Sequence, residues 1–115
     1  MFDIEFYRTR NGSCPMESFL DSLDSKMAVK ALQELSLLAE KGIELREPHS
    51  KAIGDGLFEL RIKLGSDISR AFYFFLKGRR IIVTNGFIKK SQKTPSREIR
   101  RARLFKQDWE ERYGS

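Results

Sequence analysis

The spacing of apolar residues changes from helical to alternating in the middle of the chain, and this change limits the fold more than any other feature. Before residue 43, apolar residues such as Ala31, Leu35 and Leu38 recur at helical spacing over several turns. From residue 58 to residue 64, apolar and charged residues alternate strictly, as in a strand with one buried face. The first half is therefore expected to be mainly helical, and sheet is expected to begin near residue 57.

The pattern predicts seven elements. A strand is expected over residues 2–8, a short helix over 15–23, a second helix from an Asp24 cap to just before Gly42, a loop over 43–56, strands over 57–64, 68–76 and 80–87, and a last helix from Thr94-Pro95 to about 112. Thr94 is expected to cap that last helix, with Pro95 at its first position. Tight turns make the last three strands antiparallel, and the helical hairpin covers one face of their sheet. The order β-α-α-β-β-β-α indicates the α+β class.

Composition limits what else the chain can be. Its 115 residues, 40% of them apolar, suit one domain over residues 1–115 with one core. The single cysteine, Cys14, excludes an internal disulfide and a cysteine-rich metal site. There is no apolar run of membrane-spanning length and no order typical of a signal peptide. We therefore expect a cytoplasmic protein with no membrane, metal or cofactor.

Charge is unevenly divided between the two halves. Residues 1–60 hold 7 Lys and Arg against 11 Asp and Glu, whereas residues 61–115 hold 15 against 5. Between Lys77 and Arg103 there are ten basic residues and one acidic residue, Glu98. Such a surface attracts polyphosphate. The favoured ligand of this basic surface is nucleic acid, and RNA in particular. Two alternatives remain: the surface binds an acidic protein, or it is simply solvated and binds no partner.

The strand alternation places basic residues together. Arg61 and Lys63 share one face of their strand with Glu59. Arg70 lies in an otherwise apolar strand, where an unpaired charge is costly, so a partner or a function is expected for it. The register of the turn at residues 65–67 is ambiguous, so the sequence does not determine to which face of the sheet Arg70 points. The remaining candidates for this polar surface are the basic Lys89, Lys90, Lys93 and Arg97, and the aromatic Phe87 and Tyr73, whose rings could stack on a base.

Other chemistries find little support in the sequence. No phosphate-binding glycine loop and no metal-ligand spacing is present. His49, the one histidine, lies in a predicted loop, where a histidine is usually just exposed. If RNA is cut, the 2′-OH would attack the adjacent phosphate without a metal, and a lysine whose pKa is lowered by neighbouring cations could act as base. The simpler alternative is a solvated sheet face on which Glu59 pairs across strands.

Four segments resemble a known superfamily. They are the strand Gly56-Leu57-Phe58-Glu59-Leu60-Arg61, the run Ser69-Arg70-Ala71-Phe72-Tyr73, the segment from Gly86 to Pro95 containing Phe87-Ile88-Lys89-Lys90, and the run Glu98-Ile99-Arg100-Arg101-Ala102. Together they resemble the RelE/ParE superfamily of bacterial toxins, and most of all its HigB-like, phage-related branch. The resemblance is specific over about residues 55–105 and implies the RelE-like fold.

The resemblance also implies a function. It suggests an endoribonuclease toxin (an mRNA interferase) that cuts messenger RNA in the ribosomal A site and is inhibited by a cognate helix-turn-helix antitoxin. Arg61, Lys63, Arg70, Lys89 and Lys90 correspond to its cationic positions, and Arg70 is the best candidate for stabilising the transition state. On this basis, Arg70→Ala is expected to abolish cleavage and leave folding intact.

Three alternatives stay open. One is a ParE-type toxin that inhibits DNA gyrase, and the second is an RNA- or ribosome-binding module without activity. The third is an interaction protein for an acidic partner.

Overall fold

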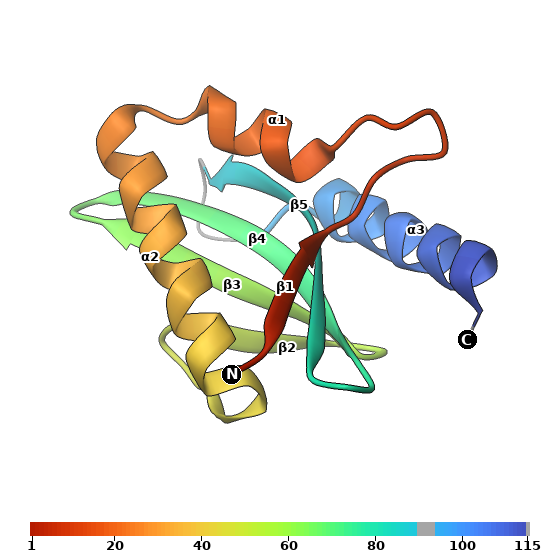
Figure 1. The fold of residues 1–115 in the computed structure, drawn as a ribbon. Helices are drawn as coiled ribbons and strands as arrows, with labels where there is room; N and C mark the ends of the chain where they lie inside the picture. The colour runs from red at the N-terminus through yellow and green to blue at the C-terminus, as the bar shows by residue number, and fades with distance from the viewer. Residues whose placement is uncertain (90–93, 115) are drawn as a thin grey trace.

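In a computed structural model that describes residues 1–89 and 94–114, a five-stranded sheet lies between helices (Figure 1). The elements are β1 (Asp3–Phe6), α1 (Pro15–Ser22), α2 (Ser25–Lys41), the 3-10 turn η1 (Gly42–Glu44), β2 (Ser50–Gly54), β3 (Leu57–Leu64), β4 (Asp67–Leu76), β5 (Arg80–Lys89) and α3 (Ser96–Tyr113). The strand order is β1-β5-β4-β3-β2. β1 runs parallel to β5, and the other pairs are antiparallel. The predicted α+β class is confirmed.

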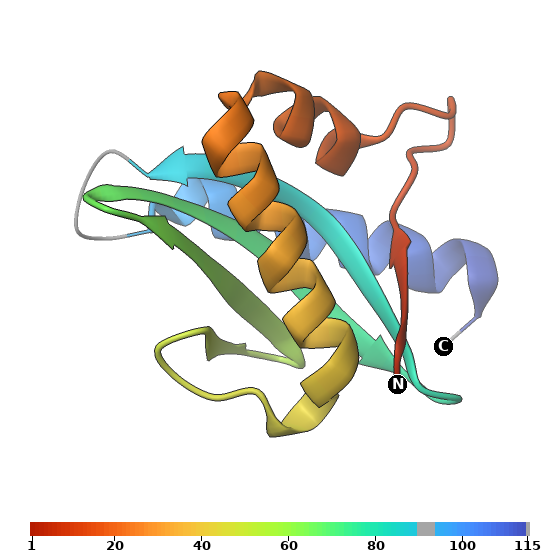
Figure 2. The same ribbon diagram turned by 60° about the vertical axis from the view of Figure 1, so that its left-hand side comes forward.

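Helices cover both faces of the sheet, and each face has its own core. Figure 2 shows α2 crossing in front of the sheet and α3 behind it. On the side of α1 and α2, Leu60, Ile62 and Tyr73 pack with Met16 and Leu38. On the side of α3, the sheet contributes Leu57, Phe72, Phe74 and Ile82, and α3 contributes Ala102, Ile99, Phe105 and Trp109. Because successive residues of a strand point to opposite faces, the aromatic run in β4 supplies both cores.

The second helix begins and ends where the sequence predicts. The Asp24 carboxylate accepts a hydrogen bond from the backbone N–H of Met27 at 2.9 Å, as an N-cap residue does. Gly42 ends α2 with φ of 55°, a left-handed conformation that favours glycine. A Cβ atom there would lie 2.0 Å from Cε1 of Phe2, so this position also requires the smallest residue.

Two local predictions are wrong. The predicted loop over 43–56 contains η1 and the strand β2, which pairs with Leu57–Leu60 through a bulge between Ala52 and Gly54. β2 is a short and largely exposed edge strand, so its sequence carries no alternation. Thr94 does not cap α3, because Pro95 occupies the cap position and the Thr94 hydroxyl donates to Glu59 at 2.8 Å.

Within the described residues, no helix is both long enough and apolar enough to cross a membrane.

Candidate active site

The strand register places four of the predicted cations on one face of the sheet. Arg61 lies directly opposite Arg70, Lys63 lies opposite Ile68, and Ile68 in turn lies opposite Lys89. Residues paired in this way point to the same face, so Arg61, Lys63, Arg70 and Lys89 share the face that α3 covers at its other end. The predicted convergence of three strands is confirmed for these four residues, and the register answers which face Arg70 takes.

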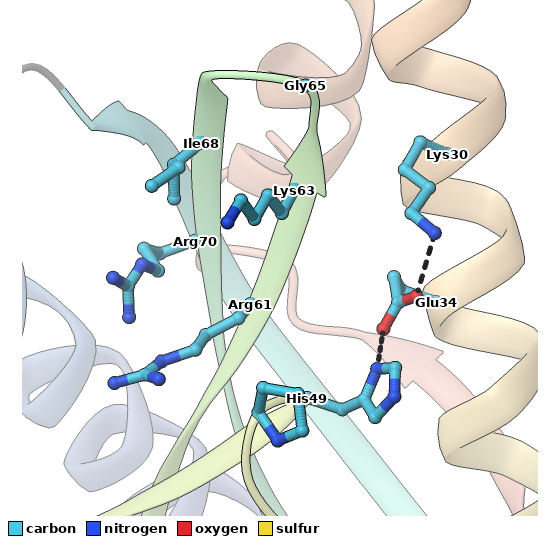
Figure 3. A pocket seen from close by; sticks show the side chains of 9 residues that line it. Lys30, Glu34, His49, Arg61, Lys63, Gly65, Ile68 and Arg70 are labelled. Atoms are coloured by element: carbon cyan, nitrogen blue, oxygen red, sulfur yellow. Dashed lines mark hydrogen bonds and ion pairs between the residues drawn. The ribbon is translucent and has the colours of Figure 1, made fainter.

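A cleft of about 480 Å³ opens beside these cations (Figure 3). Arg61, Lys63, Gly65, Ile68 and Arg70 line it from β3, β4 and the turn between them. Lys30 and Glu34 line it from α2, and Pro48 and His49 from the segment before β2. Figure 3 shows the arginines on one side of the cleft and Glu34 with Lys30 on the other, with His49 between.

Arg70 is a buried cation with a partner. Its side chain is 6% exposed, and its Nη1 donates to Oε1 of Glu59, whose side chain is 3% exposed. The Nε of Arg70 is also buried, and no hydrogen-bond acceptor in the described part of the chain reaches it. Glu59 neutralises part of the charge of Arg70, and the Arg70 side chain still lines the cleft, where its remaining positive charge can attract an anion. The partner that the sequence required for Arg70 is Glu59, on the adjacent strand.

Arg61 lies at the side of Arg70 and is less buried. Its side chain is 30% exposed, and its Nη2 lies 3.9 Å from an oxygen of the exposed Glu47. The Arg61 Nε is buried, again with no acceptor among the residues that the structure describes. Two neighbouring guanidinium groups that line one cleft can together bind a phosphate.

Lys89 does not line this cleft but an adjoining pocket, which shares Ile68 with it, and Lys89 lies in the electric field of the arginines. Partial burial lowers the pKa of the Lys89 ammonium, and the positive charges of Arg70, Arg61 and Lys51 lower it further. The carboxylate of Glu59 acts in the opposite direction and raises it. A lysine whose pKa is lowered in this way exchanges its proton more readily near neutral pH than an isolated lysine does.

His49 was not expected to belong to the site, but it lies in the cleft. Its Nδ1 is 2.9 Å from Oε1 of Glu34, and the Glu34 carboxylate is also 3.4 Å from Nζ of Lys30. The backbone carbonyl of His49 accepts a hydrogen bond of 2.8 Å from the N–H of Arg61, so His49 is placed next to that arginine. The Glu34 side chain is 6% exposed and fixes the imidazole, which is itself 43% exposed.

One signal in the sequence could have indicated this pair. Glu34 falls within the buried stripe of α2, seven residues after Met27 and three after Ala31. A carboxylate at a buried position needs a partner, and His49 provides one. The pairing itself cannot be deduced from spacing, because 15 residues and a change of element separate the two side chains.

The remaining predicted site residues do not line the cleft in the described part of the chain. Tyr73 is 1% exposed and hydrogen-bonds Ser50 within the core, so its predicted role in stacking on a base is wrong. Burial raises the pKa of its hydroxyl. Phe87 shares the face of Arg70 but is 9% exposed, stacked on Phe72. Arg97 is exposed on α3, outside the cleft lining, and Lys90 and Lys93 lie outside the described residues.

The site is suited to holding an anion. In the part of the chain that the structure describes, no three His, Cys, Asp or Glu side chains gather closely enough to hold a metal ion. The cleft instead combines two arginines, two lysines and a carboxylate-bound imidazole. These groups can bind a phosphate and move protons beside it.

Comparison with known proteins agrees with this arrangement. Residues 18–106 match the family described as phage-derived, Gp49-like proteins (DUF891), a match that includes all three strands carrying the cations. No curated protein matches the chain. The Gp49-like family is related to the RelE-type toxins, and such toxins have an antitoxin partner. The match extends over well more than half of the chain, and the chain therefore belongs to the Gp49-like family of RelE-type toxins of toxin–antitoxin systems.

Proposed function

We propose that this protein is a toxin that cuts messenger RNA on the ribosome and is inhibited by a helix-turn-helix antitoxin. The observation that carries the proposal is that Arg61 and Arg70, paired on adjacent strands, line one open cleft together with the His49–Glu34 pair. The two guanidinium groups can bind a phosphodiester in the cleft, and the histidine can move a proton beside it. Family membership supports the toxin class, and the cleft supports the nuclease chemistry.

The reaction we propose uses no metal. The 2′-oxygen attacks the adjacent phosphorus, the bond from phosphorus to the 5′-oxygen breaks, and the products are a 2′,3′-cyclic phosphate and a 5′-hydroxyl. Arg61 and Arg70 stabilise the charge that develops on the phosphoryl oxygens, and Lys63 adds to the positive field. Lys90 is kept in this cationic set as a prediction from sequence.

His49 supplies the base in this scheme. The Glu34 carboxylate accepts a hydrogen bond from the Nδ1–H of His49. Nε2 is then unprotonated and can take the proton of the 2′-hydroxyl. Lys89, whose pKa is lowered, then supplies the proton for the departing 5′-oxygen.

The gyrase-inhibiting alternative shares the fold, so the fold alone does not separate the two. The cleft favours the nuclease, since it places the imidazole and its carboxylate beside two arginines. A binding module without activity would need no such proton-transfer pair.

Transcript mapping tests the proposal. Expression of the wild-type chain should produce new transcript 5′ ends at ribosome-bound codons, and DNA supercoiling should stay unchanged. Arg61→Ala and His49→Gln should each reduce cleavage by about 10²–10⁴-fold. Lys41→Ala, which removes an exposed cation at the far end of α2, serves as the matched control and should cut like the wild type. Inhibition of growth with altered supercoiling and no new 5′ ends would refute the nuclease function.

A further inference from the structure

A buried carboxylate lies beneath the proposed phosphate-binding arginines. Glu59 is on β3, two residues before Arg61 and on the same face, and it is 3% exposed. It lies diagonally across from Arg70 on β4, because Arg70 pairs with Arg61 in the strand register. Its Oε1 receives the Nη1 donor of Arg70. A carboxylate that only balanced charge could stay in solvent, as Glu47 does beside Arg61.

The other oxygen of Glu59 is also occupied. Oε2 accepts the hydroxyl proton of Thr94 at 2.8 Å, directly before the Pro95 cap of α3. One carboxylate thus joins β3, β4 and the start of α3. With both oxygens held, it fixes the guanidinium of Arg70 in position.

The electrostatic effect of Glu59 opposes RNA binding. Its negative charge lies among Arg61, Arg70 and Lys89, where it weakens the attraction for a phosphate. A cleft built only to attract polyanions would be better without it. A carboxylate that reduces attraction but orders an arginine is expected where the position of the arginine matters for the reaction.

We propose that Glu59 is a positioning residue: by holding Arg70 and Thr94 together, it aims the Arg70 guanidinium at the scissile phosphate. This inference rests on the proposed nuclease function. It predicts that binding and cleavage respond to loss of the Glu59 charge in opposite directions.

Two substitutions separate position from charge. Glu59→Gln keeps the size of the side chain and removes its charge, so RNA affinity should rise by about twofold or more. Its kcat should fall by about 100-fold because a neutral amide oxygen holds Arg70 by a weaker hydrogen bond than the carboxylate does. Glu59→Asp keeps the charge, but its side chain is shorter by one methylene and its carboxylate lies farther from Arg70. RNA affinity should therefore stay near that of the wild type while kcat falls.

The matched control is Glu47→Gln. Glu47 also lies beside an arginine of the cleft, but its side chain is 64% exposed. The Glu47→Gln substitution should leave kcat unchanged. Binding is measured with a short RNA whose 2′-hydroxyls are methylated, and cleavage with the unmodified RNA under single-turnover conditions.

A third readout needs no activity. The Nε–H of Arg70, assigned by its loss in Arg70→Lys, should give a sharp NMR signal in the wild type. That signal should broaden or exchange faster in Glu59→Gln. Thr94→Val, which keeps the Glu59–Arg70 pair, should change it less and gives a milder variant if Glu59→Gln does not fold.

The outcomes distinguish the two proposals. A wild-type chain that cuts no RNA, yet shows the Arg70 signal ordered by Glu59, would refute the nuclease function and leave the positioning contact in place. Wild-type kcat in both Glu59 variants, or an Arg70 signal unchanged by Glu59→Gln, would overturn the positioning role. Parallel loss of binding and cleavage in folded Glu59→Gln would overturn it as well.

Discussion

Replacement of Arg70 by alanine should destabilise the fold as well as stop cleavage. The guanidinium and the Glu59 carboxylate are 6% and 3% exposed, so the substitution leaves a buried carboxylate with only the Thr94 hydroxyl as a described partner. Removing one member of a buried ion pair costs about 3–5 kcal/mol. A domain of this size has a total stability of about 5–15 kcal/mol. The sequence-based expectation that Arg70→Ala leaves folding intact is therefore revised.

The same reasoning gives a small cost for Arg61→Ala. The Arg61 side chain is 30% exposed and lies 3.9 Å from an exposed Glu47 carboxylate. Exposed pairs of this kind contribute about 0–1 kcal/mol. Arg61→Ala is consequently the cleaner test of catalysis, and Arg70→Ala is the cleaner test of the buried pair.

Urea unfolding followed by circular dichroism measures both costs. The double variant Glu59→Met with Arg70→Met removes both charges and should recover most of the loss, because well-packed apolar residues often replace a buried pair at little cost. A free energy of unfolding for Arg70→Ala within about 1 kcal/mol of the wild-type value, or a double variant less stable than Arg70→Ala alone, would refute the reasoning.

Three further predictions concern other parts of the molecule. Asp24→Ala should lower the free energy of unfolding by about 1 kcal/mol, because the N-cap bond to Met27 is lost, and urea unfolding against Asp21→Ala checks this. Burial and the hydrogen bond to Asp108 raise the pKa of Tyr7 to about 12 from an ordinary 10.0. The contribution of Tyr7 to stability is therefore complete below about pH 10 and is lost as the pH rises through 12. Ultraviolet titration should show a lower Tyr7 pKa in Asp108→Asn, and an unchanged value would contradict this assignment. Because the pKa of Lys89 is lowered, cleavage should fall as alkaline pH removes its proton, and Lys89→Arg should move that fall to higher pH in single-turnover rate profiles.

The periodic segments of this fold were predictable because their burial is one-sided. β3 alternates from Phe58 onward, α2 repeats at helical spacing, and the Asp24 and Gly42 ends of α2 follow local capping rules. β2 was missed because a short, exposed edge strand needs no apolar alternation. Thr94 was assigned to the wrong partner because a buried carboxylate from a distant strand competes for its hydroxyl.

The site, like the fold, was predictable only in the parts that follow from strand alternation and from the cost of burying a charge. Alternation assigned Arg61 and Lys63 to one face from sequence alone, and the cost of an unpaired charge required a partner for Arg70. The burial of Tyr73 was not foreseen, because an aromatic residue in a strand suits a core and a binding surface equally well until the covering helices are placed.

The sequence by itself determined the order of the elements apart from η1 and β2, the basic character of the second half and the residues that resemble the toxin superfamily. These depend on properties that act over a few neighbouring residues, or on the sum of charges. Only the tertiary structure decided that Glu59 holds Arg70, that Glu34 holds His49 and that Arg70 and the Glu34–His49 pair line one cleft. Such pairs depend on strand register and on the docking of α2, which bring together side chains from separate elements and leave no regular spacing in the sequence.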